Sequence, residues 1–117
     1  MTVRVANLDR QAPLGERVAV ADTWWCRLRG LLGQPPLQHG EGLLIRPCRA
    51  VHMFGMRYPI DVVFVDRDDR VVALYNQLGP GKASRYHLRA EAAVELPGGT
   101  LALTATAVGD RLSFSSS

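Results

Sequence analysis

Glycine and proline set the limits on what this chain can fold into. The 117 residues contain eleven glycines and seven prolines, which divide the sequence into short segments. Short apolar segments separated by such turn residues are typical of β-rich domains rather than helical bundles. Because a chain of this length holds one hydrophobic core, we expect a single, mainly β domain over residues 1–117, built as a compact sandwich or barrel.

Two pairs of segments have the pattern of β-hairpins. The first pair is VRVANLD and ERVAVA, with a turn that contains Pro13 and Gly15. The second pair is IDVVFVD and RVVALYNQL, joined by a turn at residues 67–69. Further strands are predicted for LLIRP, AVHMFGM, AAVELP and RLSF, and residues 115–117 are expected to form a frayed tail.

One segment, residues 22–32, has the pattern of an amphipathic helix. Asp22 is a good N-cap, and Gly33, followed by two prolines, is a good stop signal. Arg27 and Arg29 lie at the borders of its apolar stripe and can therefore reach back toward a sheet. The stripe itself consists of Trp24, Trp25, Leu28, Leu31 and Leu32. A later segment, TLALTATAV, is ambiguous between a strand and a short helix.

The charge pattern excludes some partners. The formal net charge is +3, and the basic residues are scattered from Arg4 to Arg111 without a run. Because nucleic-acid-binding chains usually carry a basic stripe interleaved with exposed aromatic residues, we expect no nucleic-acid partner. The N-terminus lacks a signal-like apolar region, and no apolar run is long enough to span a membrane. We therefore expect a cytoplasmic protein that does not associate with membranes.

The cysteines and the motif search predict no cofactor. Cys26 and Cys48 lie 22 residues apart and form no C-x-x-C unit, so we expect two free thiols. The sequence also lacks the common hydrolase, zinc, phosphate-loop and dinucleotide motifs. Cys48 and His52 could form a thiol-imidazole pair, but on one strand they would be about 13 Å apart.

The stretch VHMFGMRYPIDVVFVD and the segment AAVELP hold most of the candidate chemistry. Asp61 falls on an otherwise apolar strand face, where an unpaired carboxylate costs several kcal/mol, so it needs a donor. Arg29 is the first choice, with Arg27 or Arg57 second. Such a pair is either a structural clasp between helix and sheet or part of a polar cleft that receives a ligand. The candidate cleft residues are His52, Met56, Arg57, Asp61, Arg29 and Glu95.

Four ordered motifs resemble a known family. They are RLRGLLG, MRYPIDVVFVDRDDRVV, VELPGG and VGDRLSF, and they resemble the bacterial and archaeal family called domain of unknown function 192, over about residues 18–114. Leu32 departs from the methionine that is usual in that family. The resemblance implies a compact β-sandwich or barrel with one or two short helices, and it favours a second helix at about residues 100–106. It implies no particular reaction.

The leading functional hypothesis is a binding or accessory module without intrinsic catalysis, whose partner is an unidentified small molecule or protein. The first alternative is an enzyme that uses Asp61 or His52 as general acid or base. The second is copper(I) binding through His52, Met53 and Met56, since imidazole and thioether ligands suit that ion. Against the copper site, His52 and Met53 would point to opposite faces of a strand.

Overall fold

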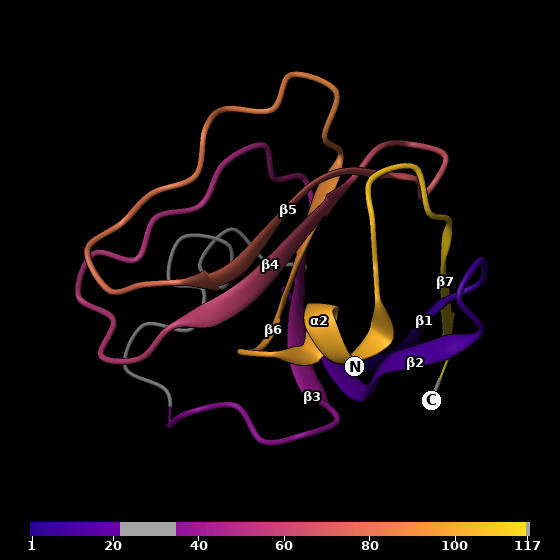
Figure 1. The fold of residues 1–117 in the computed structure, drawn as a ribbon, viewed down its shortest axis with the longest axis horizontal. Helices are drawn as coiled ribbons and strands as arrows, with labels where there is room; N and C mark the ends of the chain where they lie inside the picture. Colours follow the sequence, from indigo (N-terminus) through magenta and orange to yellow (C-terminus); the bar gives the residue numbers. More distant parts are fainter. Residues whose placement is uncertain (22–34, 117) are drawn as a thin grey trace.

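In the computed structural model, residues 1–21 and 35–116 are described, and their strands form one curled sheet (Figure 1). The described part also contains one short helix, α2. The strands are β1 (Thr2–Asn7), β2 (Ala12–Ala21), β3 (Glu41–Ile45), β4 (Ile60–Val65), β5 (Val71–Leu78), β6 (Ala92–Pro97) and β7 (Leu112–Ser116), and the helix is α2 (Thr100–Thr104).

The sheet has seven strands in the order β5-β4-β6-β3-β2-β1-β7. Neighbouring strands are antiparallel except for the parallel pair β2 and β3. The sheet curls until its two edge strands meet at one end. There the Val71 amide donates to the Asp110 carbonyl oxygen at 2.8 Å, and the Leu112 amide donates to the Asp69 carbonyl oxygen at 2.9 Å. The result is a half-barrel, which confirms the prediction of a mainly β, single compact fold.

The two faces of the sheet are covered by two hydrophobic clusters. The cluster on the inner face of the half-barrel includes residues from every strand together with Leu101 of α2. The cluster on the outer face is covered by the loops of residues 46–59 and 79–91, which contribute Val51, Met53 and Ala90. Because both faces are covered, all six residues of β4 are buried. This explains why its sequence is a nearly continuous apolar run rather than an alternating one.

Most of the predicted elements are present. The β1–β2 and β4–β5 hairpins both form. The turn of the first hairpin lies at residues 8–11, however, and Pro13 and Gly15, which were predicted to be in the turn, lie within β2. The helix α2 confirms a helix within residues 100–106. The helix predicted at residues 22–32 lies outside the described residues. The tail expected to fray beyond residue 114 continues the last strand, since Ser115 and Ser116 pair with β1.

The strand predicted for AVHMFGM is wrong. Within this segment only His52 forms a bridge, to Ala83, and the surrounding residues 46–59 form a loop. Gly55 has a φ of 83°, a left-handed conformation that ends an extended segment. Val51 and Met53 are nevertheless buried while His52 is exposed, so the apolar alternation reflects a loop that packs on the outer face of the sheet.

Candidate functional site

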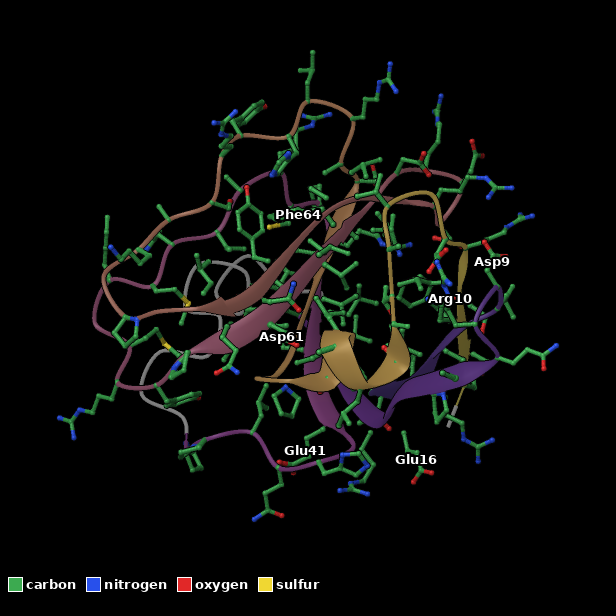
Figure 2. The ribbon with its side chains drawn as sticks, in the orientation of Figure 1. Asp9, Arg10, Glu16, Glu41, Asp61 and Phe64 are labelled. Atoms are coloured by element: carbon green, nitrogen blue, oxygen red, sulfur yellow. The ribbon has the colours of Figure 1, made fainter. Side chains whose placement is uncertain are left out.

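Asp61 is fully buried on the inner face of β4, next to the start of α2 (Figure 2). Its Oδ1 accepts a hydrogen bond from the Gln77 amide at 2.8 Å. Its Oδ2 accepts from the amides of Gly99 at 3.1 Å and Leu101 at 2.8 Å. Gly99 is the N-cap of α2 and has no side chain to satisfy the first N–H groups of the helix. Asp61 therefore caps α2 and ties it to β4 and β5.

The donors to Asp61 among the described residues are backbone N–H groups, whereas the sequence suggested an arginine. Arg29 and Arg27 lie outside the described residues, and among the described ones Arg57 is exposed and forms no ion pair with Asp61. Within residues 1–21 and 35–116, three backbone N–H groups supply hydrogen bonds to both carboxylate oxygens. Asp61 thus has a structural role, and the carboxylate oxygens that a ligand would need already accept hydrogen bonds.

Glu95 lies on the other side of the sheet. In the strand register it is opposite Leu43 of β3 and Val62 of β4. Directly opposite residues point to the same face, and both neighbours belong to the outer cluster. The sheet therefore separates Glu95 from Asp61, and the residues predicted to form one cleft are divided between two faces.

One oxygen of the Glu95 carboxyl group is buried and has no hydrogen-bond partner among the described residues. The side chain is 6% exposed, and within residues 1–21 and 35–116 its Oε1 is the buried side-chain oxygen or nitrogen that has no hydrogen bond. Burial raises the pKa of Glu95 from 4.5 to about 7. Buried polar atoms are nearly always paired, and strongly shifted acids concentrate at functional sites. Glu95 therefore marks the candidate site.

Three side chains of the 46–59 loop pack on the outer cluster of hydrophobic residues that Glu95 faces: Cys48, Met56 and Tyr58. Burial raises the pKa of Cys48 to about 11, and burial also raises the pKa of Tyr58; the negative charge of Glu95 adds to both increases. The Cys48 thiol donates to the Ala50 carbonyl oxygen at 3.3 Å. We call Glu95, Cys48, Met56 and Tyr58 the Glu95 cluster.

The raised pKa of Cys48 predicts a slow thiol. At pH 8 the thiolate fraction of a group with a pKa of about 11 is about a hundredfold lower than that of one at the ordinary value of 9.0. We expect iodoacetamide to modify Cys48 about a hundredfold more slowly in the native protein than in urea, as measured by site-resolved mass spectrometry. Equal native and unfolded rates would contradict the burial of this thiol.

His52 and Arg57, which were predicted to line the cleft, are both exposed on the solvent side of the same loop. The His52 ring lies against the Phe54 ring, with centroids 4.9 Å apart and an interplanar angle of 31°. Met56, by contrast, is half-buried on the side that faces the sheet. Of the predicted site residues, the structure thus brings Glu95 and Met56 to one cluster and leaves His52 and Arg57 outside it.

The residues proposed as copper ligands are similarly divided. Met53 is 1% exposed, while its neighbour His52 is exposed to solvent. In the part of the chain that the structure describes, no group of three or more His, Cys, Asp or Glu residues could hold a metal ion. Within the same residues, no helix is both long and apolar enough to cross a membrane.

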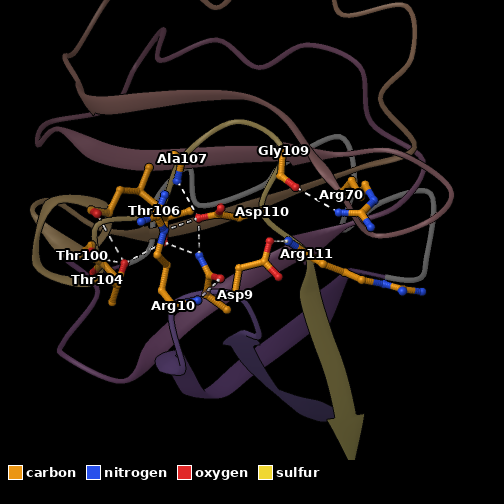
Figure 3. A network of polar contacts seen from close by, with 12 residues as sticks. Asp9, Arg10, Arg70, Thr100, Thr104, Thr106, Ala107, Gly109, Asp110 and Arg111 are labelled. Carbon is orange, nitrogen blue, oxygen red and sulfur yellow. Dashed lines mark hydrogen bonds and ion pairs between the residues drawn. The ribbon is translucent and has the colours of Figure 1, made fainter.

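A second polar centre, around Asp110, was missed by the functional reading of the sequence (Figure 3). Asp110 Oδ2 accepts hydrogen bonds from Asn7 Nδ2 at 2.9 Å, Arg10 Nε at 3.0 Å and the Ala107 amide at 2.9 Å. The Asn7 bond is the main cause that lowers the pKa of Asp110 below its usual value. Asn7 also donates to Thr106 Oγ1 at 3.1 Å. The network fastens β1 to the loop before β7, and its members are satisfied by one another.

The fold and the sequence both have counterparts among known proteins. A crystal structure of a protein of unknown function from Novosphingobium aromaticivorans DSM 12444 has a TM-score of 0.81 at 23% identity, covering 97% of this chain and 84% of that one. A crystal structure of a putative transcription regulator from Sinorhizobium meliloti 1021 has a TM-score of 0.78 at 22% identity, covering 96% of this chain and 91% of that one. At these identities the likeness shows the fold.

No curated protein matches the sequence. A family model does match, over residues 5–114: it is DUF192, described as an uncharacterized ACR. The match includes every described strand except the first residues of β1 and the last of β7. The chain therefore belongs to the DUF192 family.

Proposed function

We propose that this chain is a small ligand-binding module without intrinsic catalysis, and that its ligand binds at the Glu95 cluster. One observation carries the proposal: Glu95 Oε1 is buried and has no hydrogen-bond partner in the described part of the chain. A buried acceptor without a donor costs roughly 1–3 kcal/mol. A ligand that donates an N–H to this oxygen would remove that free-energy cost. Ligand binding would therefore stabilise the protein.

The surroundings of Glu95 indicate the chemistry of the ligand. Its cross-strand neighbours are Leu43 and Val62, and Met56 packs on the same cluster. Ligand sites of this kind are mostly apolar, with a few polar groups that fix orientation. The best match is a small apolar molecule with one amino group, whose ammonium form would pair with the ionised carboxylate.

Acid–base catalysis is a second candidate, favoured by the pKa of Glu95. A value of about 7 is suited to proton transfer near neutral pH. In this version the proton is exchanged by Glu95, whereas the sequence pointed to Asp61 or His52. Asp61 is less suited, because its oxygens already accept three backbone hydrogen bonds.

The binding proposal is tested with a panel of small alkyl and aryl amines, each matched to the hydrocarbon of the same shape. We expect one or more amines to raise the free energy of unfolding of the parent protein by about 2.7 kcal/mol at a hundredfold excess over Kd, and so to raise its unfolding midpoint. The hydrocarbons should have little effect. Because the amine pairs with ionised Glu95, Kd should worsen as pH falls below about 7. Thermal and urea unfolding with each compound measure both effects.

Glu95→Gln is the critical variant, since it keeps the shape of the side chain and removes the charge. It should abolish the amine effect, whereas Glu16→Gln, at an exposed position of β2, should leave it intact. Equal responses of the parent and Glu95→Gln would refute the site. Turnover of any panel compound by the parent but not by Glu95→Gln would favour the catalytic version instead.

A further inference from the structure

Two long loops are paired along one flank of the half-barrel: residues 46–59, between β3 and β4, and residues 79–91, between β5 and β6 (Figure 1). The pairing bonds run from the Met53 amide to the Lys82 carbonyl oxygen (2.7 Å), from Ser84 to Val51 (2.9 Å) and from His87 to Arg49 (2.8 Å). Val51 and Met53 pack on the sheet, so the alternate residues of the pair face solvent. We call this exposed side the loop surface and define it as His52, Phe54, Arg57, Lys82, Arg85 and Tyr86.

The charge of the whole chain is concentrated in these two loops. Of the 14 basic and 11 acidic residues, the loops hold six basic residues and one acidic residue, which leaves eight basic against ten acidic residues elsewhere. The loops therefore carry a net charge of +5 and the rest of the chain −2. The ion pair within residues 1–21 and 35–116 joins Arg10 to Asp110, so the loop cations are not neutralised by direct pairing with described residues.

Large aromatic rings lie among these cations and face solvent. Phe54 is 59% exposed and Tyr86 is 65% exposed. The Phe54 ring is next to the His52 ring, and Phe54 directly follows Met53, which is hydrogen-bonded to Lys82 in the other loop. Tyr86 follows Arg85 in sequence. In proteins that bind single-stranded nucleic acid, exposed aromatic rings stack on unpaired bases while neighbouring cations contact the phosphates.

We propose, contrary to the expectation from the sequence, that the loop surface binds single-stranded nucleic acid. Arg57, Lys82 and Arg85 contact phosphates, and Phe54 and Tyr86 stack on unpaired bases. A duplex hides the base faces that such stacking needs, so a single strand is the form that uses both the rings and the charge. This site is separate from the Glu95 cluster, which lies beneath the loops, and it does not depend on it.

An anionic membrane fits the same loops less well. A bilayer takes up any exposed apolar side chain, and the most exposed one in these loops is Leu88, at 77%. Leu88 adjoins Arg89, which borders a depression lined by three acids and three arginines: Asp66, Asp68, Glu91, Arg49, Arg67 and Arg89. The three carboxylates offset the three arginines, so the surface beside Leu88 has no net positive charge that would attract an anionic lipid surface. The aromatic rings lie instead in the part of the loops where acidic residues are absent from the sequence.

The test uses the full-length protein and a fluorescently labelled oligothymidylate, with anisotropy measured from about 50 to about 200 mM salt. We expect binding that weakens as salt rises. Phe54→Ala and Tyr86→Ala should each weaken it roughly tenfold without changing the salt slope. Arg85→Gln should lower the slope of log K against log salt by about 0.7. Arg4→Gln, at an exposed arginine of β1, and Leu88→Ala should change neither quantity.

Two results would overturn the proposal. The first is no detectable binding of the oligonucleotide at low salt. The second is binding to vesicles that contain phosphatidylserine, with a larger loss for Leu88→Ala than for Tyr86→Ala, which would assign the loops to a membrane. Since all the altered side chains are exposed, urea unfolding should show parent-like stability for each variant and so exclude misfolding as the cause of any loss.

Discussion

Asp61→Ala is expected to lower the free energy of unfolding by about 3–5 kcal/mol. The carboxylate accepts hydrogen bonds from the amides of Gln77, Gly99 and Leu101, at 2.8–3.1 Å, in a fully buried position. Alanine would leave these three N–H groups buried and unpaired, and α2 would lose its cap. Urea unfolding of the parent and the variant at pH 7 measures the difference.

A matched control comes from the β4–β5 turn. Asp66 also accepts two backbone hydrogen bonds, from the amides of Asp68 and Arg70, but these contacts are open to solvent. Water can replace the lost acceptor there, so Asp66→Ala should cost about 1 kcal/mol. If the two substitutions cost the same, burial would not be what makes the Asp61 bonds important.

The second large effect concerns the pH dependence of stability. The pKa of Glu95 is about 7 in the folded protein and 4.5 in the unfolded reference, so the folded state binds the proton more tightly. The stabilisation that this tighter proton binding gives the folded state is fully present below pH 4.5 and is lost as pH rises from 4.5 to about 7. Above that pH the stability no longer changes through Glu95. A difference of about 2.5 pH units corresponds to about 3 kcal/mol.

Glu95→Gln removes this titration while keeping the size of the side chain. We expect the parent to lose about 3 kcal/mol of stability relative to Glu95→Gln between pH 4.5 and about pH 8, measured as the difference between their urea unfolding free energies. Glu16→Gln, at an exposed position, should differ from the parent by a nearly constant amount. A flat difference for Glu95→Gln would mean that Glu95 has an ordinary pKa.

The two buried acids show what could be predicted about the candidate site. Strand alternation placed Asp61 on the same face as Val63 and Val65, and the structure agrees. The sequence pointed to an arginine side chain as the donor, with Arg29 as the first choice, and Arg29 lies outside the described residues. The described donors are backbone amides of residues 16 to 40 positions later in the chain. No sequence pattern identifies such donors, because every residue except proline carries the same N–H.

Glu95 illustrates the opposite case. The sequence drew attention to it as an acid between apolar neighbours in AAVELP. It could not show that Glu95 and Asp61 face opposite sides of the sheet, because that depends on the pairing of β6 with β4. In the observed register Asp61 is opposite Leu96, while Glu95 is opposite Val62. A shift of one residue would have placed both acids on the same face.

The sequence by itself determined the class of fold, because glycine and proline spacing, strand alternation and capping signals are local properties of a few neighbouring residues. It also determined the family, through four short motifs in order. Only the tertiary structure decided which distant residues meet. It divided the predicted cleft between two faces, and it gathered cations that are scattered along the chain onto two paired loops. Charge and burial act through space, and the distances that set their strength exist only after the sheet has curled and the loops have packed on it.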